Sequence, residues 1–478
     1  MSGMPLMDAW RRAKALARHP MQVPGHKLRF SDHPDLDAKL AFGYAELYEL
    51  VRDDIPLQGG VDDNAYTNKY LDLAEAEWAR AVGADHARFL VGGSSQGNIS
   101  ALAAVGRPNV PLAIDRTAHR STQGGLIVSG ARPHWIYPDL HPEFHLPIGV
   151  AAASIASIGE SVSAVFVTSP SYIGTLSPVS ALAAAAHRIG VPLVVDQAWG
   201  AHLAFMSSRG AIAEGADVCV TSVHKALMGY SQTAVISMRD GRLDRSTLDR
   251  AVDLTNTTSP SGTLLASIDA SRELMERSGV AALDRTIEAV ANARARLARV
   301  RGLVVLDDSN AGCAVDPTKL TLVLPRTGAS GVDIGAALFD LGHGPETADR
   351  DTVVLTVTVM DDPAFIEEIG EVLASLVEEY RGDPRPPSPA AVWTVRPEVI
   401  ITPREAFFGK RRRIRMDDAV GQVSAEQFCP YPPGVPLLAP GEGITAETID
   451  AIRAAAQVGR VAYCSDPTLE TIEIVELT

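Results

Sequence analysis

The chain has 478 residues, of which 46 % are apolar and 21 % charged, and its formal net charge is −15 at pH 7. A chain of this length and composition buries a large core and normally divides into two or three domains. Its negative charge disfavours nucleic acid and anionic membranes as partners, so small molecules are expected instead.

The cysteines and the N-terminus both indicate a cytoplasmic protein. The four cysteines are far apart, without the spacing of a metal site or a disulfide framework, and we predict neither. The first twenty residues lack the apolar run of a secretory signal. Their apolar positions recur at helical spacing and predict a short amphipathic docking helix that Pro20 ends. No stretch reaches the ~18 apolar residues of a membrane span.

Residues from about 60 to 240 alternate short apolar runs with helical patterns, which is typical of an α/β domain on a mainly parallel sheet. Six runs predict its strands: ARFLVGG, VPLAID, SAVFVTSP, VPLVVDQA, ADVCVTS and TAVISMR. Most of them end in polar residues or glycine. Because ligands collect at the carboxyl ends of strands in open α/β sheets, we expect the site residues there.

The second half of the chain predicts further domains. A helical pattern over 264–300 connects to three apolar runs and a closing helix, which indicate a small α+β domain. The Pro-rich segment GDPRPPSPAA predicts a linker, and the prolines of CPYPPGVPLLAPGEGIT predict an ordered loop. We therefore divide the chain into an N-terminal segment (1–59), a large α/β domain (60–300), a small α+β domain (301–382) and a C-terminal domain (391–478).

Two charged residues follow predicted strands and suit one cofactor. SVHKAL places Lys225 directly after ADVCVTS, where a desolvated lysine is nucleophilic enough to form a Schiff base, although most lysines are solvated surface groups. Asp196 ends VPLVVD, and a carboxylate there can keep the pyridine nitrogen of pyridoxal 5′-phosphate (PLP) protonated. Asp196 could equally cap the following helix, and the two roles are compatible.

Two further motifs complete the pattern. FLVGGSSQGNISALAAV reads as strand, Gly-rich turn and helix, whose backbone N–H groups and the hydroxyls of Ser94 and Ser95 can bind a phosphate. It matches neither nucleotide-binding motif, GxGxxG or Walker A. His119, after VPLAID, could stack on a flat ring, carry a proton or be a satisfied core histidine. The order of loop, His, Asp and Lys, each at a strand end, favours PLP.

These motifs resemble the bacterial ornithine/lysine/arginine decarboxylases, a family of fold-type-I PLP enzymes. The resemblance runs from PGHK (24–27) almost to the C-terminus. It is strong in GGSSQGN, DRTAHRS, TSPSYIGT, DQAWGAH, SVHKALMGYSQTA, TTSPSG, ITPREAFFGK and CPYPPGVPLLAPGEGIT, of which the last two separate the family from aminotransferases of the same fold. It implies a fold-type-I architecture in a short form without the N-terminal wing domain of larger members.

The resemblance also implies roles for individual residues. Lys225 would form the Schiff base, Asp196 would bind the pyridine nitrogen, and His119 would stack over the ring. Ala198 would pack beneath it, and the remaining cofactor contacts would come from Ser94, Ser95, Gln96, Ser222 and His224. Thr258 would reach the cofactor of the neighbouring subunit, which implies a homodimer with shared sites. Trp199 would contact the substrate, and Glu442 would bind its distal cation.

Three segments depart from the family pattern. Gln197 replaces a glutamate beside the cofactor aspartate, and IPLQGGVDDNAYTNKY replaces an LPGLDDLH-type stretch. The run from Lys410 to Arg415 is unusually basic, and we favour a solvated loop there over an anion-binding or regulatory patch.

The implied reaction is decarboxylation of lysine, ornithine or arginine to a polyamine-type amine and CO2. An aminotransferase or an oxidative deaminase of basic amino acids is the nearest alternative, because the same residues serve all of these reactions. A catalytically silent regulatory homologue is the alternative from another class, and intact Lys225, Asp196 and His119 speak against it.

Overall fold

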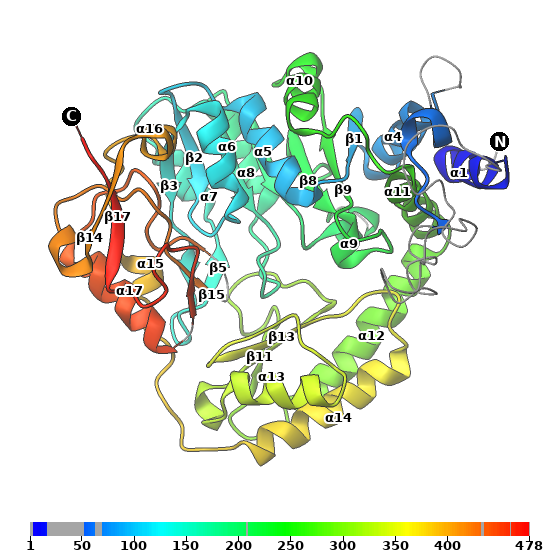
Figure 1. Ribbon diagram of the computed structural model, residues 1–478. Helices are drawn as coiled ribbons and strands as arrows, with labels where there is room; N and C mark the ends of the chain where they lie inside the picture. Colours follow the sequence, from blue (N-terminus) through cyan, green and yellow to red (C-terminus); the bar gives the residue numbers. More distant parts are fainter. Residues whose placement is uncertain are drawn as a thin grey trace, which may run out of the picture.

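The computed structural model describes residues 3–16, 52–62, 69–206, 209–431, 435–458 and 460–477. The PGHK motif and part of the segment 55–70 lie outside these residues. Figure 1 shows a large α/β layer, a smaller sheet below it and a C-terminal segment against one side. No helix among the described residues is long and apolar enough to cross a membrane.

The large layer is built on a seven-stranded sheet in the order β1-β9-β8-β7-β6-β2-β3. Only β9 runs antiparallel to its neighbours, so the sheet is mainly parallel, as predicted. The strands are β1 (His86–Leu90), β2 (Pro111–Asp115), β3 (Arg132–Ile136), β6 (Val165–Thr168), β7 (Leu193–Asp196), β8 (Val218–Ser222) and β9 (Ala234–Met238). All six predicted strands are present. The sequence analysis missed β3, because this half-exposed edge strand lacks a continuous apolar run.

Helices cover both faces of this sheet. The core on one face joins the strands to α5 (Gly93–Val105), α6 (Ser121–Ser129) and α10 (Arg245–Thr255). The core on the other face includes α7 (Ala152–Ala156) and α8 (Val179–Arg188). Successive strand residues alternate between the two cores, as Val194 and Val195 do. Burial on both faces explains why the strands read as continuous apolar runs.

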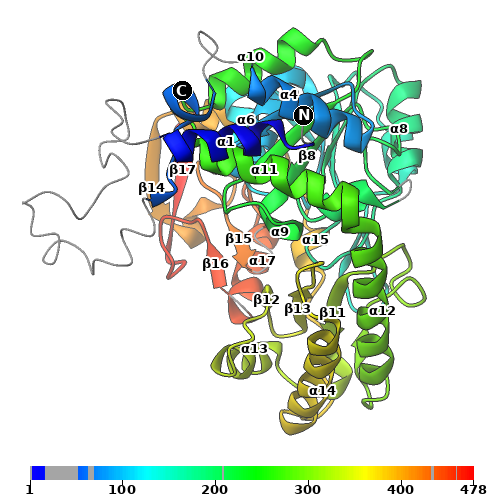
Figure 2. The ribbon, with the colours of Figure 1, turned by 90° about the vertical axis from the view of Figure 1, so that its right-hand side faces the viewer.

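The predicted docking helix forms as α1 (Pro5–Leu16) and buries Leu6 and Ala9. It packs against α4 (Tyr70–Val82) and α11 (Gly262–Leu274), beside the short η1 (Leu57–Val61), and Figure 2 shows it lying along α11. Asp269 of α11 accepts hydrogen bonds from the backbone N–H groups of Leu6 and Met7. A side chain from another helix thus satisfies free N–H groups at the start of α1.

A second, four-stranded antiparallel sheet lies below the first. It is reached through η3 (Met275–Gly279) and α12 (Val280–Leu297) and has the order β10-β11-β13-β12. Its strands are β10 (Val304–Val305), β11 (Lys319–Val323), β12 (Thr347–Ala348) and β13 (Thr352–Thr356). Around it lie η4 (Pro325–Thr327), α13 (Gly331–Asp340) and α14 (Pro363–Glu379), and α14 packs along α12.

Backbone hydrogen bonds fasten this second sheet to the large layer. The N–H of Asp316 donates to the carbonyl of Gly174, and the N–H of Leu176 donates to the carbonyl of Ala314, each at 2.8 Å. Side chains add to this junction, since the buried His202 of η2 (Ala201–Phe205) lies 3.0 Å from the carboxylate of Asp316.

The contact between His202 and Asp316 allows a prediction about how the stability of the fold changes as the pH falls. Burial opposes the charge of Asp316, but His202 and the hydrogen bonds of Thr318 outweigh it and lower the pKa of Asp316 to about 2. A depressed pKa stabilises the fold above the unfolded value near 4, and this contribution is lost as the pH falls towards 2. We expect Asp316→Asn to lose about 2 kcal/mol at pH 7 and to show a shallower decline of stability below about pH 4.

Urea unfolding at pH 7, 4 and 3 would measure this effect, with the exposed Asp417→Asn as the matched control. If the free energy of unfolding fell with pH in the same way for the wild type and for Asp316→Asn, the lowered pKa of Asp316 would be contradicted.

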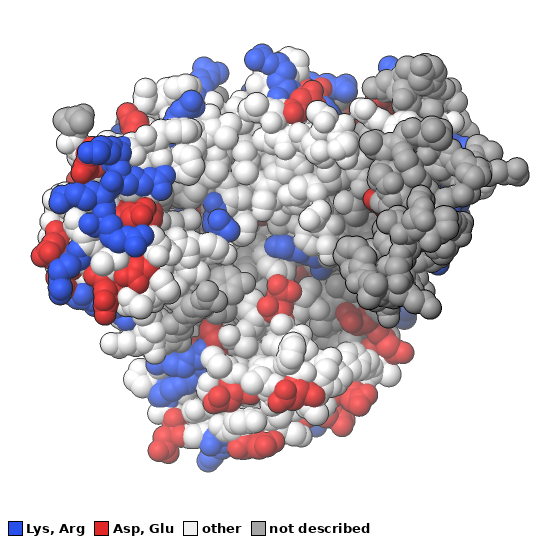
Figure 3. Space-filling model, viewed as in Figure 1, with Lys and Arg blue, Asp and Glu red and all other residues white. Residues whose placement is uncertain are grey.

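The C-terminal segment packs against the β2–β3 side of the large sheet (Figure 1). Its elements are α15 (Ala391–Thr394), α16 (Pro403–Phe408), β14 (Arg411–Arg415), η5 (Met416–Ala419), β15 (Cys429–Tyr431), α17 (Ala446–Val458), β16 (Arg460–Ala462) and β17 (Thr471–Val475). The basic run therefore forms a strand paired with β17 and not a loop, which corrects that prediction. Its side chains are largely solvated, and several form ion pairs with Glu473 or Glu476. Figure 3 shows basic and acidic side chains gathered on the side of the molecule where Figure 1 labels β14 and β17.

Candidate active site

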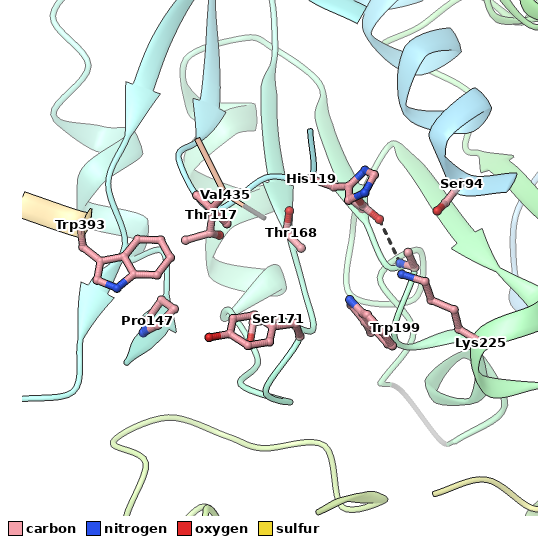
Figure 4. A pocket seen from close by; sticks show the side chains of 13 residues that line it. Ser94, Thr117, His119, Pro147, Thr168, Ser171, Trp199, Lys225, Trp393 and Val435 are labelled. Atoms are coloured by element: carbon pink, nitrogen blue, oxygen red, sulfur yellow. Dashed lines mark hydrogen bonds between the residues drawn. The ribbon is translucent and has the colours of Figure 1, made fainter. Parts of the chain in front are cut away.

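A cleft opens where the parallel strands end, and its lining includes the three residues predicted to be catalytic, Lys225, His119 and Asp196. The empty volume of the cleft is about 580 Å³, which includes the solvent-filled space at its open mouth. Figure 4 shows Ser94, His119, Trp199 and Lys225 at one end, with Trp393 and Pro147 at the other. The remaining lining residues are Thr117, Thr168, Ser171, Tyr172, Asp196, Ala198 and Val435. The short hairpin of β4 (Asp139–Leu140) and β5 (Pro147–Gly149) contributes Pro147.

Lys225 enters the cleft from α9 (Val223–Ala226), the single turn that follows β8. Its Nζ lies 3.6 Å from the centroid of the Trp199 ring. Desolvation lowers the pKa of Lys225 and outweighs the opposing attraction of Asp196 and Glu346. A lysine with a lowered pKa has more of the neutral amine, which is the nucleophilic form.

Asp196 is held in a buried network at the end of β7. The side chain is 2 % exposed, and its two oxygens accept hydrogen bonds from Asn98 Nδ2 at 2.7 Å and from the Ala198 N–H at 3.0 Å. Asn98 also donates to Ser121, whose hydroxyl lies 2.9 Å from Nδ1 of His119. The network leaves acceptor capacity on Asp196 and fixes its direction, as a pyridine N–H would require.

The hydroxyls and the helix start opposite Lys225 are suited to a phosphate. Ser94 lines the cleft in the first turn of α5, a thirteen-residue helix whose N-terminal dipole favours an anion. Gly93 has φ of +69°, a conformation that glycine adopts without strain. The buried Ser222 hydroxyl has no hydrogen-bond partner among the described residues, and neither has the Thr168 hydroxyl. Thr168 lines the cleft, and Ser222 ends β8 directly before the turn that carries Lys225. Their unpaired buried hydroxyls are consistent with an anionic ligand nearby, so the residues present fit PLP.

The other predicted cofactor residues have varied positions. Ala198 lines the cleft, and Ser95 lies beside Ser94 in the first turn of α5. Gln96 accepts a hydrogen bond from the Gly92 N–H and so shapes the turn. His224 Nδ1 lies 2.8 Å from the Thr233 carbonyl, to which it donates. Thr258 is exposed in the turn between α10 and α11, and its predicted contact with a neighbouring subunit stays a prediction.

Glu442 is not brought into the cleft. It is 1 % exposed and forms a bidentate ion pair with Arg116, which is 2 % exposed. Its Oε2 also accepts the Ala439 N–H at 2.7 Å. Because both oxygens are engaged, the pair links the C-terminal segment to the end of β2 and gives no support to the expected contact of Glu442 with a substrate cation.

This pair predicts a large loss of stability on mutation. Glu442→Gln leaves Arg116 buried without a counter-ion, and we expect the free energy of unfolding to fall by about 3 kcal/mol. Urea denaturation would measure it, with the surface variant Glu476→Gln as a control that loses less than about 1 kcal/mol. Unchanged stability together with a raised KM would instead favour substrate contact.

Comparison with known proteins identifies the family. One family model, described as the Orn/Lys/Arg decarboxylase major domain, matches residues 5–321, and its C-terminal domain matches residues 389–461. The chain belongs to this family. The resemblance noted in the motifs is thereby confirmed, and the chain is a member of a decarboxylase enzyme family.

Individual members of the Orn/Lys/Arg decarboxylase family align along almost the whole chain. An arginine decarboxylase of Bacillus subtilis is 28 % identical over 482 residues, covering 97 % of this chain and 96 % of that protein. An arginine decarboxylase of Halalkalibacterium halodurans is 27 % identical, with the same two shares covered. The structure of a Francisella novicida lysine decarboxylase has a TM-score of 0.83 at 17 % identity, covering 99 % of this chain and 81 % of that one. This likeness confirms the predicted fold class.

Several residues that line the cleft were not predicted from the sequence. Trp393 and Val435 come from the C-terminal segment and close the cleft. Tyr172 and Thr117 line it from loops after β6 and β2. Asn98 could have been found, because it is a polar residue one helical turn after Ser94 on the helix that starts at the cleft.

Proposed function

We propose that this chain is a PLP-dependent decarboxylase that converts a basic amino acid to its amine and CO2. The observation that carries the proposal is the convergence of Lys225, Asp196 and His119 on one cleft, with free hydroxyls and a helix N-terminus beside them. Arginine is the first substrate to test, since three relatives that align along almost the whole chain are named arginine decarboxylases.

The residues present divide the work of such a reaction. Lys225 would hold the cofactor covalently, Asp196 would bind its ring nitrogen, and Ser94 and Ser222 would bind its phosphate. PLP, when bound, withdraws electrons from the bonds to the substrate Cα atom. The lowered pKa of Lys225 makes its Nζ a base that can take up a proton and return it to Cα near neutral pH. Trp199, Tyr172 and Trp393 place aromatic rings along the cleft, where they would shield a bound substrate from part of the solvent.

We also propose that the active enzyme is a cytoplasmic homodimer with shared sites and serves polyamine synthesis. The exposed position of Thr258 supports the shared site, because such a residue is free to reach a neighbouring subunit. Mixing Thr258→Ala chains with Lys225→Ala chains tests it. Partial recovery of activity in the mixed dimer is the expected result, and no recovery would contradict it.

The main test is to incubate the PLP-loaded protein separately with arginine, ornithine and lysine and to quantify CO2 and the amine. Equal amounts of CO2 and of agmatine, putrescine or cadaverine would support the proposal and name the substrate. Pyridoxamine phosphate without CO2, or oxygen uptake without CO2, would replace it with an aminotransferase or an oxidative deaminase.

A further inference from the structure

A second lysine lies beside the proposed catalytic lysine. Lys319, the first residue of β11, has its Nζ 4.3 Å from the centroid of the Trp199 ring, whose other lysine neighbour is Lys225. Trp199 and Lys225 line the cleft, and Lys319 lies against the same indole without being among the lining residues.

Lys319 is a buried cation without a carboxylate in contact. It is 2 % exposed, and its Nζ donates a hydrogen bond to the Thr356 hydroxyl at 2.9 Å. Among the described residues no carboxylate forms an ion pair with it. The nearby Asp316 is already bonded to His202 and Thr318. A buried ammonium with only a neutral partner is costly, and an arriving anion would relieve that cost.

Electrostatics around Lys319 are consistent with an anion-binding position. Burial, with a smaller contribution from the Lys225 charge, outweighs the attraction of Asp316 and Glu346 and lowers the pKa of Lys319 to about 8. Lys319 therefore keeps much of its charge near neutral pH and gains more when a carboxylate binds.

The backbone holds Lys319 in place. The preceding Asp316 is hydrogen-bonded to Gly174, and a side chain at Gly174 would come within 2.8 Å of the Lys319 Cβ. Gly174 also has φ of +93°, so glycine serves both the turn and the close approach. Thr321 of the same strand donates to the Ile173 carbonyl. The lysine therefore comes from a fixed strand and not from a mobile loop.

We propose that Lys319 binds the carboxylate of the amino-acid substrate. The inference rests on the proposed function. Every candidate substrate carries this carboxylate, whatever its side chain, and the other anion expected in the cleft, the cofactor phosphate, has its own donors at α5 and Ser222. Lys319 would hold the carboxylate only until it leaves as CO2, so its contribution is to substrate binding.

The test compares the amino acid with its own decarboxylated amine. Borohydride reduction fixes PLP on Lys225, so the reduced holoenzyme binds ligands without turnover. Calorimetry then gives Kd for arginine and agmatine, or for whichever pair the wild type converts. In Lys319→Met we expect amino-acid binding to weaken about 10- to 100-fold and amine binding to stay within about 2-fold. Lys319→Arg should recover part of the loss.

Steady-state kinetics give an independent readout. Binding of the carboxylate before it leaves is ground-state binding, so Lys319→Met should raise KM while kcat changes little. Thr356→Val is the matched control, because it removes the hydrogen bond of Lys319 and keeps the cation. We expect it to change amino-acid binding by less than about 5-fold.

Three results would overturn the inference. Equal weakening of amino-acid and amine binding would show a packing role, and unchanged amino-acid binding would show no role. A loss in Thr356→Val as large as in Lys319→Met would show that only the local structure matters. If Lys319→Met does not fold, Lys319→Gln, which also removes the charge but keeps a polar group beside Thr356, decides by the same ratio. Wild-type CO2 release with any of these results would defeat this inference alone, whereas no CO2 from the wild type would defeat the proposed function.

Discussion

Lys225→Ala is expected to lower decarboxylation by at least about 10³-fold and to abolish the yellow colour of the PLP-loaded protein. In the proposed mechanism, the side chain would supply both the amine that holds the cofactor and a base beside the substrate Cα. Its lowered pKa and its contact with Trp199 place both roles on one nitrogen. Absorbance spectra and CO2 release would measure the two losses on the same sample.

The matched control is Lys410→Ala. The side chain of Lys410 is 80 % exposed, belongs to the C-terminal segment and is not among the residues that line the cleft. It should leave colour and activity unchanged. If Lys225→Ala remained yellow and active, the lysine that binds PLP would be another one, and Lys319 would be the first to examine.

Asp196→Asn is expected to lower kcat by about 10²- to 10³-fold. The amide lacks the negative charge that keeps a ring nitrogen protonated, although it has nearly the shape of the carboxylate. It also places an NH2 group near Asn98 and the Ala198 N–H, which both donate to Asp196. We therefore expect weaker PLP binding as well, measurable by equilibrium dialysis.

Asn98→Ala should have a smaller effect of the same kind, because it removes one donor that orients Asp196 and leaves the charge. The exposed Asp240→Asn is the control. A kcat for Asp196→Asn within about 5-fold of the wild type would mean that Asp196 serves the fold through its hydrogen bonds and not the cofactor.

The large sheet and one end of the site could be predicted because short segments of sequence determine them. Strands buried on both faces need continuous apolar runs, and each parallel strand must present its last residues at the same edge. Ser94, His119, Asp196 and Lys225 all follow such runs. Their meeting in one cleft follows from strand direction without any knowledge of side-chain packing.

The remaining site residues depend on contacts between distant segments. Trp393 follows a Pro-rich linker, and no local pattern tells which surface that linker brings it to. Lys319 begins a strand of the second sheet and resembles any strand-end lysine until the junction with Gly174 places it beside Trp199. For Glu442 the motif implied a contact with the substrate, whereas in the folded chain its carboxylate forms an ion pair with Arg116, which is far away in the sequence. β14 is similar, because a basic run resembles a solvated loop until β17 pairs with it.

The most direct test of the central claim is to reduce the PLP-loaded protein with borohydride, digest it and locate the added phosphopyridoxyl group by mass spectrometry. We predict a single modified peptide with the group on Lys225, and loss of that modification when arginine is present during reduction. Modification of another lysine, or of many lysines at low yield, would contradict the assignment of this cleft as the cofactor site.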